Sequence, residues 1–319
     1  MFEPSQIIFA PTTRCNLSCA HCRVTRTDEE LSAEDAVRLL ESCVSHGVDR
    51  IGFSGGEPFL RTDFIVDVCK AAVEQGMYFD RIMTNGVWFA DEADLREKLQ
   101  PLFDAGFDGT FGISMDAYHG QDPEKLALFF KTIHSIWNRK DGTEIISVRS
   151  SDDAAFFSSI EKLAGLLGSQ IKKLGEEIVS ISDATYAKNV EEGFDDGSGL
   201  YIPVQRVPYS AAASEKAWNS ARWFTDDFCE GPGNVFYVHA NGTVAVCCGY
   251  ANEDGKLIVG RITDTYETLF KSARTNDYIS LCYEKGLAAK RQEMEADGFI
   301  FPGKTNDMCF FCDYMCKRG

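Results

Sequence analysis

The chain has 319 residues, and 44% of them are hydrophobic, which is enough to bury one large core and a smaller second one. Its 49 acidic and 32 basic residues give a formal net charge of -17 at pH 7. This charge repels a phosphate backbone, and no local cluster of basic residues offsets it, so we expect no nucleic-acid partner.

The first residues, Met1–Gln6, lack the basic segment and the long apolar stretch of a signal peptide. No apolar run of about 18 or more residues follows, so we expect no membrane-spanning segment and no membrane partner. The expected location is the cytoplasm. In that reducing compartment, twelve cysteines favour metal ligands and buried thiols over disulfides.

Apolar strands alternate with amphipathic helices along the first two thirds of the chain, which is typical of parallel βα units and predicts an α/β fold. The expected strands are Ile7–Ala10, Asp49–Phe53, Arg81–Met83, Phe111–Ile113, Ile145–Val148 and Tyr201–Val207. The expected helices are Ser32–Val44, Thr62–Ala72, Asp91–Leu99, Pro123–Arg139 and Asp152–Leu167.

The first two expected helices carry start signals and cysteines. Ser32 and Asp35 resemble a capping box, and Thr62 is the expected cap of the second helix. Cys43 and Cys69 fall on the apolar faces of these helices. We therefore expect both cysteines to be small core residues rather than ligands.

Three cysteines follow the first expected strand with the spacing Cys15-x3-Cys19-x2-Cys22. Thiolates are the ligands of iron–sulfur clusters, and three of them can hold three irons of a 4Fe-4S cube while the fourth iron has no protein ligand. A zinc site would need a fourth ligand, and His21 is poorly placed between Cys19 and Cys22 to share their metal. A disulfide pair would suit a secreted domain.

The cysteine spacing resembles the cluster motif of the radical SAM superfamily, in which the open iron chelates the amino and carboxylate groups of S-adenosylmethionine. A second motif, Ser54-Gly55-Gly56-Glu57-Pro58, is similar to the loop that receives the methionine amino group in that family. The two glycines let backbone approach a ligand, and Glu57 offers acceptor charge to an ammonium. Alone, this run would be an ordinary strand-to-helix turn. The resemblance implies a partial (β/α)6 barrel.

Polar residues follow the later strands, at the end of a parallel barrel where chemistry collects. The resemblance implies that Ser114 and Asp116 contact the ribose of the cofactor, with Asn85 nearby. Turn formation and helix capping are the alternatives for these residues. Arg149 could pair with the cofactor carboxylate or could be a surface arginine. His119 is a candidate proton carrier.

The βα rhythm ends near Trp218, which predicts a barrel domain at 1–217 and a small cysteine-rich β-hairpin and α domain at 218–319. Two β-rich segments between Asn234 and Cys247 are joined by Asn241-Gly242, a strong signal for a tight hairpin. Such a hairpin would bring Cys229 toward Cys247.

The spacing Cys229-x12-Gly242-x4-Cys247 looks like the opening of the SPASM or twitch domains of radical SAM enzymes. The closing cysteines depart from the full SPASM pattern, and too few are present to ligate two further clusters once helical Cys282 is set aside. The resemblance implies one auxiliary 4Fe-4S cluster, or else a structural zinc. The expected ligands are Cys229, Cys247, Cys309 and Cys312, with Cys316 as a replacement for either of the last two.

Cys248 directly follows Cys247, so its thiol is expected on the opposite face of the strand, away from the metal. The run Phe228–Cys248, with Cys309-x2-Cys312 and Asp116-Ala-Tyr-His119, resembles the radical SAM peptide epimerases of epipeptide biosynthesis. In that family a radical removes an α-hydrogen from an L-residue and a cysteine returns hydrogen to the other face. The resemblance implies that Cys248 is this donor. Alternatively, Cys248 is a buried thiol or a cluster ligand.

The expected activity is reductive cleavage of S-adenosylmethionine and hydrogen abstraction from a ribosomally made peptide, with flavodoxin or ferredoxin as electron donor. Because the cluster motif begins at Cys15, peptide recognition is expected from a partner protein or from the segment Asp183–Leu200. Two alternatives share most motifs. One is a radical SAM enzyme that crosslinks, dehydrogenates or acts on a small molecule, and the other is an electron-transfer protein, which would not need the Gly-Gly-Glu-Pro loop.

Overall fold

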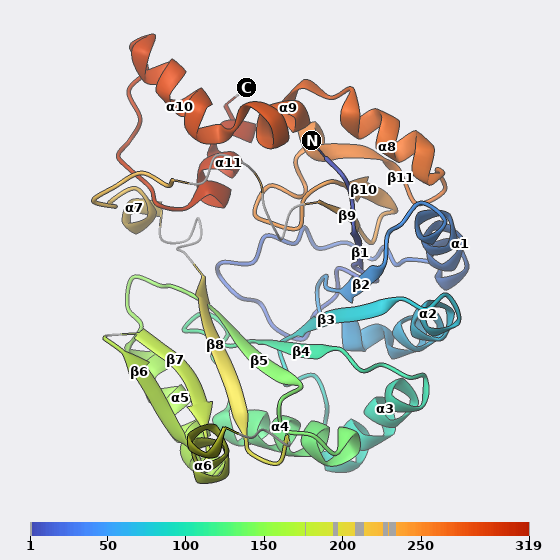
Figure 1. The fold of residues 1–319 in the computed structure, drawn as a ribbon, viewed down its shortest axis with the longest axis vertical. Coiled ribbons are helices and arrows are strands. Elements are labelled where there is room, and N and C mark those ends of the chain that lie inside the picture. The colour runs from blue at the N-terminus through green and yellow to red at the C-terminus, as the bar shows by residue number, and fades with distance from the viewer. Residues whose placement is uncertain are drawn as a thin grey trace.

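The computed structural model describes residues 2–175, 177–193, 197–207, 214–225, 229 and 234–318. Within these ranges, one sheet of eleven strands passes through the molecule in the order β11-β10-β9-β1-β2-β3-β4-β5-β8-β7-β6 (Figure 1). The sheet is curved, and the helices α1 to α4 lie along its outer side (Figure 1). The main cavity described below lies on the inner side of the sheet, and a small cavity lies in the C-terminal region.

Six parallel strands form the centre of the sheet, and each coincides with an expected strand. They are β1 (Gln6–Phe9), β2 (Arg50–Phe53), β3 (Tyr78–Thr84), β4 (Thr110–Ser114), β5 (Thr143–Val148) and β8 (Tyr201–Val207). β2 and β4 are buried on both faces, as expected for strands that are covered on both sides. The predicted α/β fold with a six-stranded partial barrel is confirmed.

The outer helices agree with the expected ones within a few residues. They are α1 (Ala33–Val44), α2 (Thr62–Glu74), α3 (Glu92–Asp104), α4 (Pro123–Trp137) and α5 (Ala154–Leu166). Ser32 caps α1 and accepts a hydrogen bond from the Asp35 N–H at 3.4 Å, as expected. The prediction that Thr62 caps α2 is wrong. A 3-10 turn, η1 (Pro58–Arg61), leads directly into α2, and the Thr62 hydroxyl donates back to the Phe59 carbonyl.

A hairpin that the sequence analysis did not predict extends one edge of the sheet beyond β8. It consists of β6 (Gln170–Leu174) and β7 (Glu177–Ser182), which pair antiparallel, and β7 pairs antiparallel with β8. The helix α6 (Ala184–Glu192) follows β7 within the segment expected to recognise a peptide. Residues 194–196 of that segment lie outside the described ranges.

The expected hairpin near residue 241 is present and continues the barrel sheet on its other edge. β9 (Val235–Val238) pairs parallel with β1 and antiparallel with β10 (Thr243–Ala245), and β10 pairs with β11 (Ile258–Arg261). The turn places Gly242 at φ +77°, which suits a residue without a side chain. Because β9 is bonded to β1, the hairpin is fixed against the barrel. The proposed domain boundary at 217/218 stays a prediction.

Short helices complete the C-terminal region at the top of Figure 1. They are α7 (Ser214–Ala217), α8 (Tyr266–Arg274), α9 (Asp277–Ser280), the π-helical turn η4 (Leu281–Lys285), α10 (Leu287–Ala296) and α11 (Met308–Cys316), together with a 3-10 turn, η3 (Gly255–Leu257), before β11. Among the helices of the described ranges, none is long and apolar enough to cross a membrane.

The main core lies between the barrel sheet and the outer helices. Aromatic rings dominate it: Phe59 stacks on Trp88 with ring centroids 4.6 Å apart, and Phe111 meets Phe129 edge to face. Cys43 and Cys69 are completely buried in this core, as expected of small apolar residues. Burial raises the pKa of the Cys43 thiol to about 12, so it stays protonated at neutral pH.

Candidate active site

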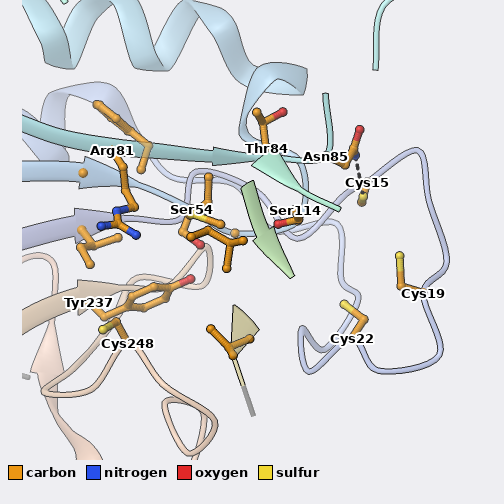
Figure 2. Close-up of a pocket in the computed structure, with 18 of the residues that line it drawn as sticks. Cys15, Cys19, Cys22, Ser54, Arg81, Thr84, Asn85, Ser114, Tyr237 and Cys248 are labelled. Carbon is orange, nitrogen blue, oxygen red and sulfur yellow. Dashed lines mark hydrogen bonds between the residues drawn. The ribbon is translucent and has the colours of Figure 1, made fainter. Parts of the chain in front are cut away.

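A cavity of about 630 Å³ occupies the inner side of the barrel and extends to the β9–β10 hairpin. All three cysteines of the N-terminal motif line it: Cys15, Cys19 and Cys22. Figure 2 shows these cysteines at one end of the cavity and Tyr237, Cys248 and Arg81 at the other, with Ser54 between them. The cavity therefore joins the N-terminal motif to the C-terminal region.

Two N–H donors hold Cys15, one from its own loop after β1 and one from the end of β3. The Leu17 backbone N–H donates to Cys15 Sγ at 3.4 Å, and the Asn85 amide donates to the same sulfur at 3.6 Å. Asn85 also donates to Asn16 Oδ1 at 2.8 Å. The Arg26 guanidinium closes the loop through the Leu17 carbonyl at 2.9 Å. Burial raises the pKa of the Cys15 thiol, and the Leu17 N–H partly offsets this by favouring the thiolate, which is the form of cysteine that binds iron.

The two glycines of the Gly-Gly-Glu-Pro loop let the chain's own backbone approach closely, and their expected role beside a ligand stays a prediction. A Cβ on Gly56 would lie 2.1 Å from the Arg14 carbonyl oxygen, and a Cβ on Gly55 would lie 2.8 Å from the Thr12 carbonyl oxygen. The Gly56 N–H donates to Thr12 O at 2.9 Å. Although both glycines line the cavity, the absent side chains make room for the chain's own backbone, which carries the cysteine loop.

Glu57 is completely buried and is not among the residues that line the main cavity. Its carboxylate accepts hydrogen bonds from Phe59 N at 3.2 Å, Thr84 Oγ1 at 2.9 Å and Asn85 N at 2.8 Å. Burial raises the pKa of Glu57 to about 7. The structure therefore corrects the sequence interpretation: Glu57 ties the loop to the end of β3 and positions Asn85, instead of facing a methionine ammonium.

The other residues assigned to the cofactor divide into two groups. Asn85 and Ser114 line the main cavity. Arg149 does not, because its guanidinium pairs with Glu177 at 2.7 Å on the unpredicted hairpin. Arg26, which the sequence analysis did not single out, is the arginine that lines the cavity beside the cysteine loop.

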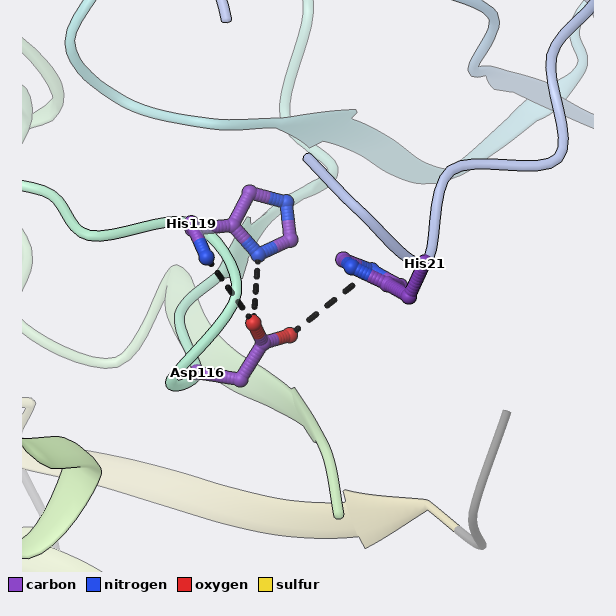
Figure 3. Close-up of side chains that lie close together, drawn as sticks. All are labelled: His21, Asp116 and His119. Atoms are coloured by element: carbon purple, nitrogen blue, oxygen red, sulfur yellow. Dashed lines mark hydrogen bonds and ion pairs between the residues drawn. The ribbon is translucent and has the colours of Figure 1, made fainter. Parts of the chain in front are cut away.

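Asp116 organises two histidines beside the cysteine loop (Figure 3). Its carboxylate lies 2.9 Å from His119 Nδ1 and also accepts from the backbone N–H groups of Tyr118 and His119. Burial opposes a charge on His119, but its hydrogen bonds with Asp116 and Cys19 raise its pKa to about 9. His21 Nε2 lies 3.9 Å from Asp116, and burial lowers the pKa of His21.

Of these three residues, His21 and His119 line the main cavity and Asp116 does not. The carboxylate of Asp116 is therefore occupied by its protein partners, and its expected contact with a ribose stays a prediction. Asp116 holds His119, and His119 presents its ring to the cavity. The sequence could have suggested the pair, because Asp116 and His119 are three residues apart in one loop after β4.

Cys248 lies at the end of the main cavity opposite the N-terminal cysteines. The residue before it, Cys247, lines a different cavity. The two neighbouring thiols thus line different cavities, but β10 ends at Ala245 and Cys248 lies in a bend, so the expected strand does not extend to these cysteines. Burial raises the pKa of the Cys248 thiol to about 12, so the thiol keeps its proton at neutral pH.

A small cavity of about 30 Å³ lies between the end of β10, η4 and α11. It brings together the four cysteines that the sequence analysis grouped and one more: Cys229, Cys247, Cys282, Cys309 and Cys312. Cys282 was set aside as helical, but the π-helical turn η4 turns it into this cavity. Its carbonyl accepts from the Cys229 N–H at 3.1 Å. Phe228 and residues 230–233 of the expected motif lie outside the described ranges.

The spacing of these sulfurs bears on the choice between a cluster and a zinc ion. In the part of the chain that the structure describes, the one group of three or more metal-binding side chains with ligand atoms within 4.8 Å of one another is His21, Asp116 and His119. Four sulfurs around one zinc lie about 3.8 Å apart for Zn–S bonds of about 2.3 Å. The described cysteine sulfurs are therefore not arranged as they are around one zinc ion, but a volume of about 30 Å³, close to that of one water molecule, is also too small for a 4Fe-4S cube, so both alternatives stay open. Cys316 is buried one helical turn beyond Cys312 and does not line this cavity.

Residues 9–147 match the family model described as Radical SAM superfamily. The chain contains a radical SAM domain. This stretch begins at the last residue of β1 and includes β2 to β4, most of β5, the three N-terminal cysteines and the Gly-Gly-Glu-Pro loop.

Curated relatives of the radical SAM domain include a GTP 3',8-cyclase of Lactiplantibacillus plantarum, which is 34% identical over 121 residues, or 36% of this chain and 34% of the relative. A probable GTP 3',8-cyclase of Methanothermobacter marburgensis is 38% identical over 100 residues, or 30% of each chain. The chain thus spans about a third of the length of these relatives.

Solved structures extend the likeness beyond the radical SAM domain. The crystal structure of Streptococcus suis SuiB bound to precursor peptide SuiA covers 97% of this chain and 76% of SuiB, with a TM-score of 0.54 and 14% identity. SuiB bound to S-adenosylmethionine covers 91% of this chain and 66% of SuiB, with a TM-score of 0.52 and 14% identity. At this identity the likeness shows a shared fold, including the C-terminal region.

Proposed function

We propose that this protein is a radical SAM enzyme that modifies a peptide by exchanging hydrogen at an α-carbon, with Cys248 as the hydrogen donor. The product is a D-residue in place of an L-residue. One observation carries the proposal: Cys248 and the N-terminal cysteines lie at opposite ends of one cavity. A carbon placed between them can lose hydrogen toward one end and gain it from the other.

The residues of the main cavity fit a 4Fe-4S cluster and S-adenosylmethionine. Three thiols in one loop match the donor set of a cluster with one open iron, and two N–H donors already point at Cys15 Sγ. Ser54, Asn85 and Ser114 offer polar groups along the path from the cysteines to Cys248. When bound, these groups supply a 5'-deoxyadenosyl radical, and the surrounding barrel excludes water from it.

The role of Cys248 is transfer of one hydrogen atom. The S–H bond breaks, a C–H bond forms on the substrate carbon, and a sulfur-centred radical stays on Cys248. One electron and one proton restore the thiol, and the electron comes from flavodoxin or ferredoxin. A thiol suits this role because burial keeps it protonated, so the hydrogen is present when the substrate carbon needs it.

Three arginines line the main cavity: Arg26, Arg50 and Arg81. Arg81 pairs with Glu144 at 3.0 Å and Arg50 lies 3.6 Å from Asp49, whereas Arg26 donates to the Thr13 and Leu17 carbonyls. Support for a peptide substrate therefore comes from the fold likeness rather than from the lining charges. SuiB, which shares the fold, was crystallised with its precursor peptide, and this supports a peptide substrate here.

We also propose one auxiliary 4Fe-4S cluster in the small cavity, held by Cys229, Cys247, Cys309 and Cys312. The four cysteines line one cavity, and their resemblance to the SPASM and twitch pattern supports a cluster over the structural zinc. Iron, sulfide and zinc are counted after anaerobic reconstitution. We expect about eight irons per chain, whereas about four irons with one zinc would contradict the auxiliary cluster.

The epimerase proposal is tested with a precursor peptide encoded next to the gene, in deuterated water. We expect one deuterium on a single α-carbon and a D-residue at that position. Cys248→Ala is expected to give no stable D-product, while the matched control Cys69→Ala, which removes a thiol from the core, keeps product formation. A crosslinked or dehydrogenated product that carries no deuterium and forms equally well in Cys248→Ala would overturn the proposal.

A further inference from the structure

A second cavity of about 510 Å³ adjoins the main one, between the cysteine loop and the β9–β10 hairpin. Four residues line both cavities and form the boundary between them: Ser54, Gly55, Tyr237 and Cys248. The main cavity is lined by the N-terminal cysteines on its other side, whereas the second cavity contains none of them. Its volume lies within the range of about 300–1,000 Å³ that is typical of ligand sites.

The walls of the second cavity are polar but poor in positive charge. Thr13 and Thr27 line one wall, and Asn241 and Thr243 line the other. The single lysine or arginine in the lining is Arg23, and it pairs with Asp313 at 2.9 Å. Hydroxyl and amide groups of this kind suit the backbone of an extended peptide, and they leave no cation for a phosphate group.

Acidic and neutral groups complete the lining. Glu29 and Glu253 are its two carboxylates, and Glu253 accepts hydrogen bonds from the backbone and side chain of Thr25. His239 Nε2 lies 2.9 Å from the Asn252 carbonyl, and burial lowers its pKa, which keeps it neutral. The cavity therefore disfavours acidic side chains and accepts uncharged or basic ones.

We propose that the second cavity binds the peptide residues that flank the reacting one, in a segment whose side chains are uncharged or basic. The inference rests on the peptide-modifying function proposed above. The flanking residues lie between the cysteine loop and the hairpin, and the reacting residue reaches the boundary at Tyr237 and Cys248. This placement gives the thiol direct access to the α-carbon from the side opposite the N-terminal cysteines.

Two contacts fix the width of this peptide site. Arg23, directly after Cys22, pairs with Asp313 on α11, and Thr25 is bound by Glu253 after the hairpin. The Arg23 guanidinium also lies over the Tyr250 ring at 5.4 Å. The segment after Cys22 and the C-terminal region are therefore held against each other. The peptide site between them is formed before a peptide binds.

The test measures how fast iodoacetamide alkylates Cys248 in the anaerobically reconstituted protein, by mass spectrometry of the peptide that contains it. Saturating S-adenosylmethionine, which occupies the end of the main cavity at the N-terminal cysteines, is expected to leave this rate within about threefold of the cofactor-free rate. Thr243→Trp, which fills the second cavity, is expected to slow alkylation about tenfold. The control Val190→Trp, at an exposed position on α6, is expected to leave it unchanged.

Thr27→Trp on the facing wall gives the same test if Thr243→Trp fails to fold. Capped pentapeptides with alanine, lysine or glutamate residues then serve as protecting ligands. The alanine and lysine peptides are expected to protect Cys248 about fivefold better than the glutamate peptide. Stronger protection by the glutamate peptide would overturn the assigned charge preference.

One result would overturn the site itself: S-adenosylmethionine alone shields Cys248 and neither tryptophan variant slows alkylation. In that case Cys248 is reached only through the main cavity. Formation of 5'-deoxyadenosine with dithionite is measured in the same samples. Its presence would confine the failure to the peptide site, whereas its absence would refute the proposed function.

Discussion

Gly56→Ala tests whether the Gly-Gly-Glu-Pro loop supports the cysteine loop. The added Cβ would lie 2.1 Å from the Arg14 carbonyl oxygen and 2.6 Å from the Thr13 carbonyl oxygen, and neither backbone atom can rotate away. The loops must separate, which breaks the hydrogen bonds from Gly56 N to Thr12 O and from Glu57 N to Arg14 O. Cys15 follows Arg14, so the displacement reaches the first cysteine of the motif.

The magnitude follows from these contacts. Two lost hydrogen bonds cost about 1 kcal/mol each, and the overlap adds about 1 to 3 kcal/mol, so the free energy of unfolding falls by about 3 to 5 kcal/mol. A chain of 319 residues has an unfolding entropy of about 0.7 kcal/mol/K. The melting temperature is therefore expected to fall by about 4 to 7 °C.

Thermal melts and iron counts of the reconstituted protein check this expectation. Gly255→Ala is the matched control, because a Cβ there meets nothing within 4 Å and its φ is not positive. The variant Gly56→Ala is expected to lose stability and about half of its iron, and the control to lose neither. If Gly56→Ala melts like the wild type, holds all its iron and only binds S-adenosylmethionine weakly, the glycine serves ligand approach and the reasoning is refuted.

Three further predictions concern buried groups. Because burial raises the pKa of Glu57 from 4.5 to about 7, its stabilising contribution is complete below pH 4.5 and is lost as pH rises through 7. Between pH 5 and 8 the wild type should lose about 3 °C more in melting temperature than Glu57→Gln, and equal losses would contradict this. Asp313→Asn should lower the melting temperature by about 2 °C, since it leaves Arg23 without its carboxylate, and an unchanged melt would show that the pair contributes nothing. Cys247→Ser should retain about four irons per chain and Cys282→Ser about eight, and the reverse result would make Cys282 a ligand.

Local signals predicted most of the fold. The six central strands are short apolar runs bounded by turns, and the hairpin at Asn241-Gly242 is fixed by the turn residues themselves. The β6–β7 hairpin was missed because β6 is almost entirely exposed and carries Lys172 and Lys173, so it lacks the buried face by which a strand is recognised.

The residues of the candidate site are likewise of two kinds: those that local sequence spacing predicts and those whose partners are distant along the chain. The N-terminal cysteines lie in one loop, so their spacing alone predicts that they line one cavity. The partners of Glu57 and Arg149 lie 27 or 28 residues away along the chain, and only the folded sheet brings Thr84 and Glu177 beside them. Cys282 enters the small cavity through a π-helical turn, for which the sequence has no local signal.

The most direct test of the account is electron paramagnetic resonance of the reduced, reconstituted protein titrated with S-adenosylmethionine. The account predicts that one cluster signal shifts on addition, and that Cys15→Ala lacks this shifting signal while the auxiliary signal persists. If no signal responds to S-adenosylmethionine in the wild type, the N-terminal cysteines do not hold a cluster with an open iron, and the proposed enzyme is contradicted.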